Sequence, residues 1–298
     1  MKKLLAVLLS AVMVLGVSAC GSSSSSEEPA EETKQTEGTA EGIDVSDIKI
    51  GCIFIGDENE GYTYAHMKSV KDMQETLGIS DEQIIYKYNT PEDEACYDAA
   101  VDLAEQGCDI IFANSFGFED FILQAAEEYP EIQFCHATGY KAASSGLANV
   151  HNFFANIYEA RYVAGVVAGM KLAELYGADT DAKIGYVGAY SYAEVKSGYT
   201  AFFLGVRSIC PNVTMEVKYT GSWANQALEK ETAEALIADG CVLVSQHADT
   251  TGAASAAEAA GIYDVGYNVS MIDAAPNYAL TSSAINWGSY ITYAVECM

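Results

Sequence analysis

The chain has 298 residues and a formal net charge of −27, because 42 acidic residues outnumber 15 basic ones. This balance disfavours nucleic acid, acidic lipid and polyphosphate as partners, since a strongly acidic protein repels them. A ligand is therefore expected to be neutral or cationic, and the length suits one large or two medium domains.

The N-terminal residues predict export. A basic start, "MKK", precedes an apolar run over residues 4–17, and "SAC" then places small residues before Cys20. This is the pattern of an export signal that is removed from the mature protein. "LGVSAC" further resembles a bacterial lipoprotein signal, in which cleavage precedes the cysteine and the cysteine carries the lipid. We expect a signal peptide over residues 1–19, a lipid anchor at Cys20, and a location on the extracytoplasmic face of the cell membrane.

Residues 20–47 are expected to comprise the lipidated cysteine and a disordered tether. From residue 21 to residue 47 the chain has no aromatic residue and is rich in Ser and Glu. Such a segment cannot bury enough apolar surface to offset the entropy lost on ordering.

From residue 48 onward, short apolar segments alternate with helical patterns, which predicts βαβ units and parallel sheets. The expected strands lie within 48–56, 83–88, 108–115, 132–139, 149–156, 183–189, 214–221, 241–248 and 263–268. The expected helices lie around 64–77, 93–106, 119–128, 157–176, 193–208, 225–239 and 251–260. Because this series is too long for one modest sheet, the prediction is an α/β protein with two doubly wound parallel-sheet lobes.

The first lobe is predicted over residues 48–155, completed by about 279–298, and the second over 156–278. A last helical pattern begins near Gly288 and stops without a cap or a return strand. We therefore expect that the chain is truncated at its C-terminus.

Two glycines in the long helical pattern, Gly165 and Gly169, have the spacing of a transmembrane helix pair. Arg161 and Lys171 bracket them too closely for a membrane span, so a helix packed tightly on a sheet is expected.

The cysteines show no CxxC pair, and several lie in or beside apolar strand-like segments, where a thiol acts as a small hydrophobic group. Free buried thiols are therefore expected in preference to a disulfide framework or a metal site. The eight cysteines are residues 20, 52, 96, 108, 135, 210, 241 and 297.

Eight segments, in order along the chain from residue 48 to residue 298, resemble the basic membrane protein family. They are "GYTYAH", "FANSFGFED", "HATGYK", "EARYVAGVVAG", "GVRSICPNV", "GSWANQALEKETAEALIADG", "QHADTTGAA" and "LTSSAINWG". The family consists of solute-binding lipoproteins of ABC importers with a type I periplasmic-binding-protein fold, two α/β lobes joined by hinge crossovers. The resemblance implies a non-enzymatic receptor that passes a purine nucleoside, or a free purine base such as adenine, to ABC permease subunits.

The resemblance also implies a set of ligand-binding residues. Tyr62, where a tryptophan is more usual, and Trp223 would stack on the ligand, and polar contacts would come from the "NSFG" segment, Glu194 and Asp249. Asn268 stands where nucleoside binders often carry an aspartate for the ribose hydroxyls, which favours a base over a nucleoside. The implied residues are Tyr62, Ser115, Phe116, Gly117, Glu194, Trp223, Asp249 and Asn268.

The residues support this assignment independently, because most of them follow predicted strands, and open α/β sheets bind ligands at the carboxyl ends of their strands. Aromatic rings can stack on a flat ligand, and carboxylates can accept hydrogen bonds from its N–H groups. Each residue also has a structural alternative. Asp249 could cap a helix by accepting the N–H near Gly252, Tyr62 and Phe116 could pack the core, and Trp223 could lie in a surface loop.

His247 and Asp249 could form half of a catalytic site, but no GxSxG, HExxH or recognisable Cys–His pattern accompanies them. His247 is expected to be a structural histidine or a secondary pocket wall, and no enzyme activity, metal or cofactor is expected. Two alternatives stay open. One is a surface nucleoside hydrolase that uses the acidic loop "GDENEG" with a metal, and the other is the same fold binding a sugar or a signalling ligand.

Overall fold

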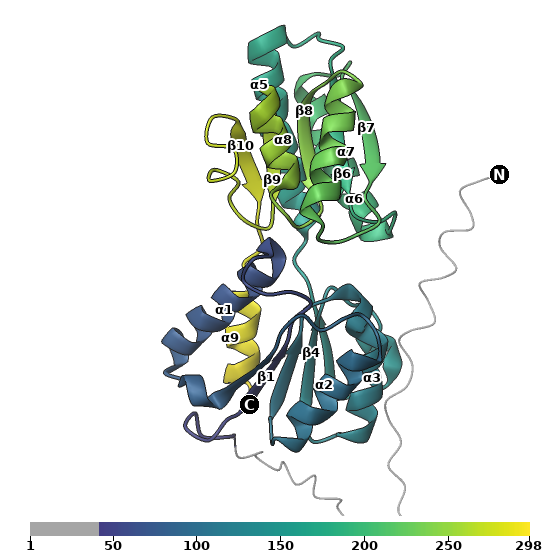
Figure 1. The fold of residues 1–298 in the computed structure, drawn as a ribbon. Helices are drawn as coiled ribbons and strands as arrows, with labels where there is room; N and C mark the ends of the chain where they lie inside the picture. The colour runs from purple at the N-terminus through teal and green to yellow at the C-terminus, as the bar shows by residue number, and fades with distance from the viewer. Residues whose placement is uncertain (1–41) are drawn as a thin grey trace, which may run out of the picture. The chain divides into compact units, whose positions relative to one another are not determined.

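The structure is a computed structural model that describes residues 42–298 (Figure 1). The predicted signal peptide, the lipid anchor at Cys20 and the predicted tether up to residue 41 lie outside the described residues. Residues 42–47 also fall within the predicted tether. They are joined to the folded part, since the Ile43 N–H donates to the Met298 carbonyl at 2.9 Å. No helix between residues 42 and 298 is long and apolar enough to cross a membrane.

The first sheet has five parallel strands in the order β2-β1-β3-β4-β5. Its central strands are apolar and buried throughout, as expected of a parallel sheet with helices on both faces. The strands are β1 (Ile50–Ile53), β2 (Ile84–Lys87), β3 (Ile110–Ala113), β4 (Gln133–Ala137) and β5 (Val150–Phe153). Its helices are α1 (Gly61–Leu77), α2 (Glu94–Glu105), α3 (Glu119–Glu128), the short α4 (Ala142–Ser145) and α9 (Gly288–Glu296), which lies beside α1 (Figure 1).

The second sheet also has five parallel strands, in the order β10-β9-β8-β6-β7. Its strands are β6 (Lys183–Gly188), β7 (Thr214–Tyr219), β8 (Cys241–His247), β9 (Tyr263–Tyr267) and β10 (Ala279–Ser283). Its helices are α5 (Ile157–Tyr176), α6 (Ala193–Ile209), α7 (Gln226–Ala238) and α8 (Gly252–Ala260). β10 pairs with β9, so residues 279–283 belong to the second sheet and not to the first lobe, in which the sequence pattern placed them.

The two sheets have the same topology, and they confirm the predicted fold of two doubly wound parallel-sheet lobes. In each sheet the first strand lies between the second and the third, so the winding reverses beside it. This reversal leaves a crevice at the carboxyl ends of the strands, which is where ligands bind in such sheets. The segments 154–156 and 284–287 run between the lobes.

Helix α5 packs on the second sheet as expected, but its Gly165 and Gly169 contact another helix and not the sheet. A Cβ atom on Gly165 would lie 2.1 Å from the Phe202 carbonyl oxygen of α6, and one on Gly169 would lie 2.9 Å from that of Val206. The glycines therefore allow the backbones of α5 and α6 to touch. Other residues of α5, such as Leu172, join the core of the second sheet.

The seven cysteines among residues 42–298 are free thiols, and all except Cys297 are buried. This agrees with the prediction of free buried thiols in that part of the chain.

Candidate functional site

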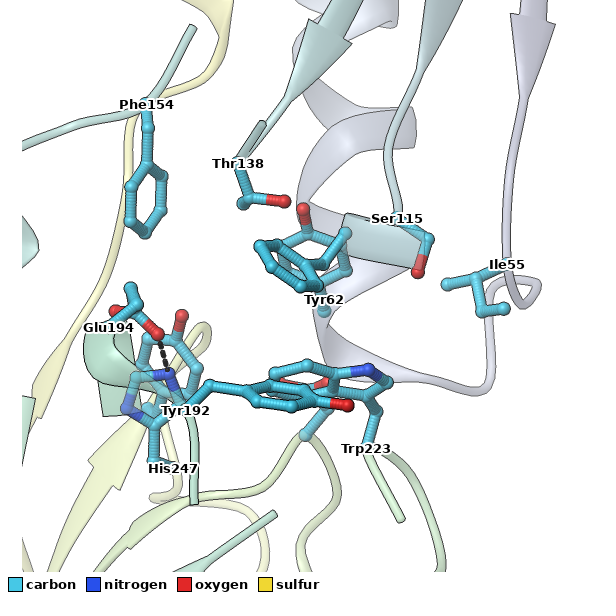
Figure 2. A pocket seen from close by; sticks show the side chains of 12 residues that line it. Ile55, Tyr62, Ser115, Thr138, Phe154, Tyr192, Glu194, Trp223 and His247 are labelled. Atoms are coloured by element: carbon cyan, nitrogen blue, oxygen red, sulfur yellow. Dashed lines mark ion pairs between the residues drawn. The ribbon is translucent and has the colours of Figure 1, made fainter. Parts of the chain in front are cut away.

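A pocket lies at the carboxyl ends of the strands and is lined by residues of both lobes (Figure 2). Its empty space is about 550 Å³, counting the open mouth. The lining residues are Ile55, Tyr62, Ser115, Phe116, Thr138, Phe154, Tyr192, Glu194, Trp223, His247, Asp249 and Tyr267.

Tyr62 forms part of the first-lobe wall from the first turn of α1. Its hydroxyl donates to the backbone carbonyl of Asn114, at the end of β3. Its ring packs edge-on to Trp287, with 5.7 Å between the ring centres. Tyr62 is thus both a core residue and a pocket wall, so the two roles considered for it are compatible.

The loop after β3 is held in place by Glu92, a residue that the sequence analysis did not single out. Its Oε1 accepts the Ser115 hydroxyl at 2.6 Å and the Gly117 N–H at 2.8 Å. Ser115 and Phe116 line the pocket, whereas Gly117 does not, and its N–H is already engaged. The His136 Nε2–H supports the same loop by donating to the Ser115 carbonyl at 2.6 Å.

Thr138, directly after β4, has an unusual backbone conformation, with φ of +67°. A β-branched residue rarely occupies the left-handed region, and such strain often occurs at functional sites. The Thr138 N–H donates to the Phe153 carbonyl at 3.0 Å, which fixes the strained residue beside the end of β5. Phe154, the next residue along, lines the pocket.

Aromatic rings from the two lobes meet at the pocket. Phe116 of the first lobe lies 5.4 Å from Tyr192 of the second, measured between ring centres. Tyr192 lies 6.0 Å from Trp223, and Figure 2 shows these two side chains along one side of the pocket. They provide apolar surfaces against which a flat ligand can stack.

Glu194 and His247 are in direct contact on the second-lobe side, drawn as a dashed line in Figure 2. The distance from His247 Nε2 to Glu194 Oε2 is 2.8 Å. Burial lowers the pKa of His247 to about 4, so the ring is neutral at pH 7 and donates its Nε2–H. Burial alone would raise the pKa of Glu194, but His247 and Arg161 hold it below its ordinary value, so Glu194 is a carboxylate.

Asp249 is held by the residue after β9, and it does not cap a helix. Its Oδ1 accepts the Asn268 Nδ2–H at 2.7 Å, while the Gly252 N–H donates to the Thr250 hydroxyl instead. Burial, and then the nearby Glu60, raises the pKa of Asp249 well above its ordinary value. Hydrogen bonds donated by a ligand would stabilise the ionised form of Asp249, which burial disfavours.

Six of the eight residues expected from the sequence line this pocket, and Gly117 and Asn268 lie outside its lining. Asn268, whose backbone φ is +65°, donates its side-chain N–H to Asp249, which does line the pocket. Five other lining residues lie at or shortly after strand ends, and that position was the only sequence signal for them. These residues are Ile55, Thr138, Phe154, Tyr192 and Tyr267.

The acidic loop considered as a metal site engages its own backbone. Asp57 Oδ1 accepts the N–H of Asn59 at 2.9 Å, and Glu60 caps α1 by accepting the N–H groups of Tyr62 and Thr63. Within residues 42–298, no group of three or more His, Cys, Asp or Glu side chains is arranged to hold a metal ion.

The twelve lining residues include two acidic side chains, Glu194 and Asp249, and neither a lysine nor an arginine. Phosphate and carboxylate ligands are usually held by such cations. The pocket is therefore suited to a flat, uncharged or cationic molecule that donates hydrogen bonds.

A family model described as "ABC transporter substrate-binding protein PnrA-like" matches residues 50–298. A purine-binding protein of Brucella abortus (strain 2308) is 34% identical over 244 residues, which are 82% of this chain and 66% of that relative. A protein of Haloferax volcanii, named as an ABC transporter glucose-binding protein, is 28% identical over 284 residues, which are 90% of this chain and 69% of that relative. The chain thus spans about two thirds of the length of each relative.

Among solved structures, solute-binding proteins of ABC transporters from Aeropyrum pernix K1 and Conexibacter woesei are similar, with TM-scores of 0.72 and 0.65. Their sequence identities are 18% and 20%, over 84% of this chain and 70% and 80% of theirs. At this identity the similarity supports the fold, which agrees with the two parallel-sheet lobes. The family match covers nearly all the described residues and confirms the resemblance to basic membrane proteins. The chain belongs to the Bmp family of PnrA-like ABC transporter substrate-binding proteins.

Proposed function

We propose that this protein is the lipid-anchored receptor of an ABC importer and that it captures a purine base or nucleoside for delivery to the permease. The site residues proposed are Tyr62, Ser115, Phe116, Glu194, Trp223 and Asp249, with Gly117 and Asn268 supporting them. The location proposed is the extracytoplasmic face of the membrane, with Cys20 as the lipidated residue.

The observation that carries the proposal is the combination of aromatic walls with two acidic groups in a lining without lysine or arginine. A purine ring is flat and can stack between such walls, with about 1–3 kcal/mol gained per stacked ring. Its N–H groups can donate to Glu194 and Asp249, and these hydrogen bonds discriminate between ligands more strongly than stacking does. The relative named as a purine-binding protein supports the same ligand class.

A free base is favoured over a nucleoside by the position of Asn268. Its side-chain amide donates to Asp249 and lies outside the pocket lining, so it is not placed to contact ribose hydroxyls. Adenine is the base we propose first, because its exocyclic amine supplies two N–H donors and, unlike guanine and hypoxanthine, it has no ring carbonyl to oppose the two acidic groups.

The experiment is a thermal-shift panel on the purified protein with adenine, guanine, hypoxanthine, adenosine, guanosine, inosine, ribose and glucose. A ligand at a hundred times its dissociation constant adds about 2.7 kcal/mol to the free energy of unfolding, which raises the melting temperature measurably. We expect a shift with adenine. A shift with glucose and with no purine would replace the proposal by a sugar receptor, the class in which the Haloferax relative is named.

Two further measurements test the remaining parts of the proposal. Release of free ribose from a nucleoside in the presence of calcium would support a hydrolase and contradict a receptor. Mass spectrometry of the mature N-terminus tests the anchor, because a lipid-modified Cys20 is expected and an unmodified N-terminus at another residue would contradict it.

A further inference from the structure

Arg161 is a buried cation behind the second-lobe side of the pocket. The residue is 2% exposed and lies in the second turn of α5. Its Nη1 donates to the Gln246 carbonyl at 2.8 Å, and its guanidinium carbon lies 4.1 Å from the centre of the Tyr267 ring. Arg161 therefore holds the end of β8 from behind and touches the back of a residue that lines the pocket.

The guanidinium group is only partly satisfied by these contacts. Its Nε and Nη2 have no hydrogen-bond partner among residues 42–298, and no carboxylate of that range lies within 4.0 Å of it. Burying a charge without compensation costs several kcal/mol, so this arrangement needs a physical reason. Glu194, the pocket carboxylate paired with His247, is an acidic group whose ionised form the arginine stabilises.

Arg161 and His247 approach each other beside Gly198 of α6. A Cβ atom on Gly198 would lie 3.0 Å from Arg161 Nε and 3.1 Å from His247 Nδ1. The absence of a side chain there leaves room for both groups. His247 Nδ1 and Glu194 Oε1 are also buried without a hydrogen-bond partner among the described residues. The three side chains thus form one polar cluster with hydrogen-bonding capacity left over, in which Glu194 and His247 line the pocket and Arg161 does not.

We propose that Arg161 is a positioning residue of the ligand site, which fixes His247 so that its Nε2–H is directed at Glu194 and leaves Glu194 as the acceptor for a ligand N–H. This inference rests on the proposed function, because it assigns the cluster to recognition of a hydrogen-bond donor on the ligand. Arg161 is not itself a lining residue of the pocket, whereas Tyr267 and His247, which lie beside it, are.

The charges around His247 agree with this role. The ring is faced by Glu194 of α6, Arg161 of α5 and Tyr267 of β9, and Asp249 follows it in sequence. Burial lowers the pKa of His247, and the positive charge of Arg161 lowers it further, while Glu194 opposes both. Removing the arginine therefore allows the histidine to take up a proton, and a charged histidine binds the Glu194 carboxylate more tightly and withdraws it from the ligand.

The first test follows His247 by NMR in the ligand-free protein, with the His247→Gln variant used to assign its resonance. In the wild type we expect no titration above a pH of about 5, because the pKa lies at about 4. In Arg161→Met we expect the titration midpoint to rise, while burial of the ring, the larger cause, still holds it below the ordinary histidine value of about 6.5. Arg161→Lys keeps the charge and should keep the depressed pKa.

The second test measures adenine affinity of the same variants at pH 6 and pH 8. We expect Arg161→Met to bind roughly tenfold more weakly at pH 6, as for loss of a hydrogen bond to a charged group, and to recover part of the loss at pH 8. Arg161→Lys should retain most of the affinity. The matched control is Arg207→Met, which changes the only other arginine, a residue at the exposed end of α6.

Gly198→Ala replaces Arg161→Met in both tests if the latter does not fold. Its methyl group would separate Arg161 from His247, and we expect this to raise the pKa of His247. Unchanged His247 titration in every variant at Arg161 and Gly198 would overturn the inference. If the titration shifts as expected but no purine binds the wild type, the proposed function is wrong. The inference is then wrong as well, because Arg161 would not position a purine site. If purines bind and the titration does not move, only the positioning role is wrong.

Discussion

At the scale of single residues, substitution of Asp249 tests the proposed ligand contacts most directly. In Asp249→Asn, the amide oxygen can still accept from Asn268, but an NH₂ group then replaces the carboxyl oxygen on the pocket side. A ligand N–H would meet a donor, so we expect adenine to bind about tenfold or more weakly by calorimetry. Asp273→Asn, at an exposed position, is the matched control and should bind as the wild type. Equal affinity in the two variants would remove Asp249 from the site.

Trp223 provides a second prediction at this scale, because the protein has only two tryptophans. Trp223 lines the pocket, whereas Trp287 is buried against His66, with 4.2 Å between the ring centres. We expect adenine to quench tryptophan fluorescence in the wild type, and Trp223→Phe to lose the quenching while keeping most of the affinity. Undiminished quenching in Trp223→Phe would place the ligand elsewhere.

The sequence could predict the residues of this pocket that directly follow apolar strands, such as Ser115 and Asp249. It could not separate residues that face the pocket from those that support them. Asn268 has the chemistry of a ligand contact, but its conformation turns its amide onto Asp249. Arg161 lies in a helix 85 residues before Gln246, its hydrogen-bond partner, so no local pattern could reveal its position.

At the scale of elements, the contact between α5 and α6 depends on Gly165 and Gly205. A Cβ on Gly205 would lie 2.1 Å from the Tyr162 carbonyl oxygen, the same closeness as that of Gly165 to Phe202. Gly165→Ala must push the helices apart, and we expect it to lower the free energy of unfolding by about 1–3 kcal/mol in urea titrations. Val163→Ala, at an exposed position of α5, should change it by less than about 0.5 kcal/mol. Equal stability of the two variants would contradict the close packing.

The sequence predicted nine of the strands and missed β10. The segment "ALTSS" has no continuous apolar run, so it does not have the pattern of a buried strand. Only its last residue is buried in the structure, and the other four are half-buried. Its pairing with β9 is set by tertiary contact. The order of strands within each sheet also follows from packing between distant segments, which periodicity does not encode.

At the scale of the whole molecule, buried acidic groups set the dependence of stability on pH. Asp264 is fully buried, neither carboxyl oxygen has a hydrogen-bond partner among the described residues, and burial raises its pKa to about 8. Above a pH of about 6.5 the histidines are neutral in both states, whereas Asp264 holds its proton only in the folded state. The unfolded state then binds fewer protons, so stability falls as pH rises toward 8.

We expect the free energy of unfolding to fall between pH 6.5 and pH 8, with Asp264 contributing up to about 1.4 kcal/mol per pH unit. Asp264→Asn should flatten this dependence, as measured by urea unfolding at several pH values, whatever its effect on stability at one pH. Asp273→Asn should leave the slope unchanged. An equal slope in wild type and Asp264→Asn would show that Asp264 is ionised or solvated in the folded protein.

The central claim concerns what the pocket between the aromatic walls and the two acidic groups binds, and one calorimetric titration tests it most directly. Adenine is titrated into the purified protein, and glucose is then titrated into a second sample of the same preparation. We predict one-to-one binding of adenine with a micromolar or tighter dissociation constant, which corresponds to a binding free energy of about −8 kcal/mol, and no heat from glucose. Binding of glucose without binding of adenine would contradict it.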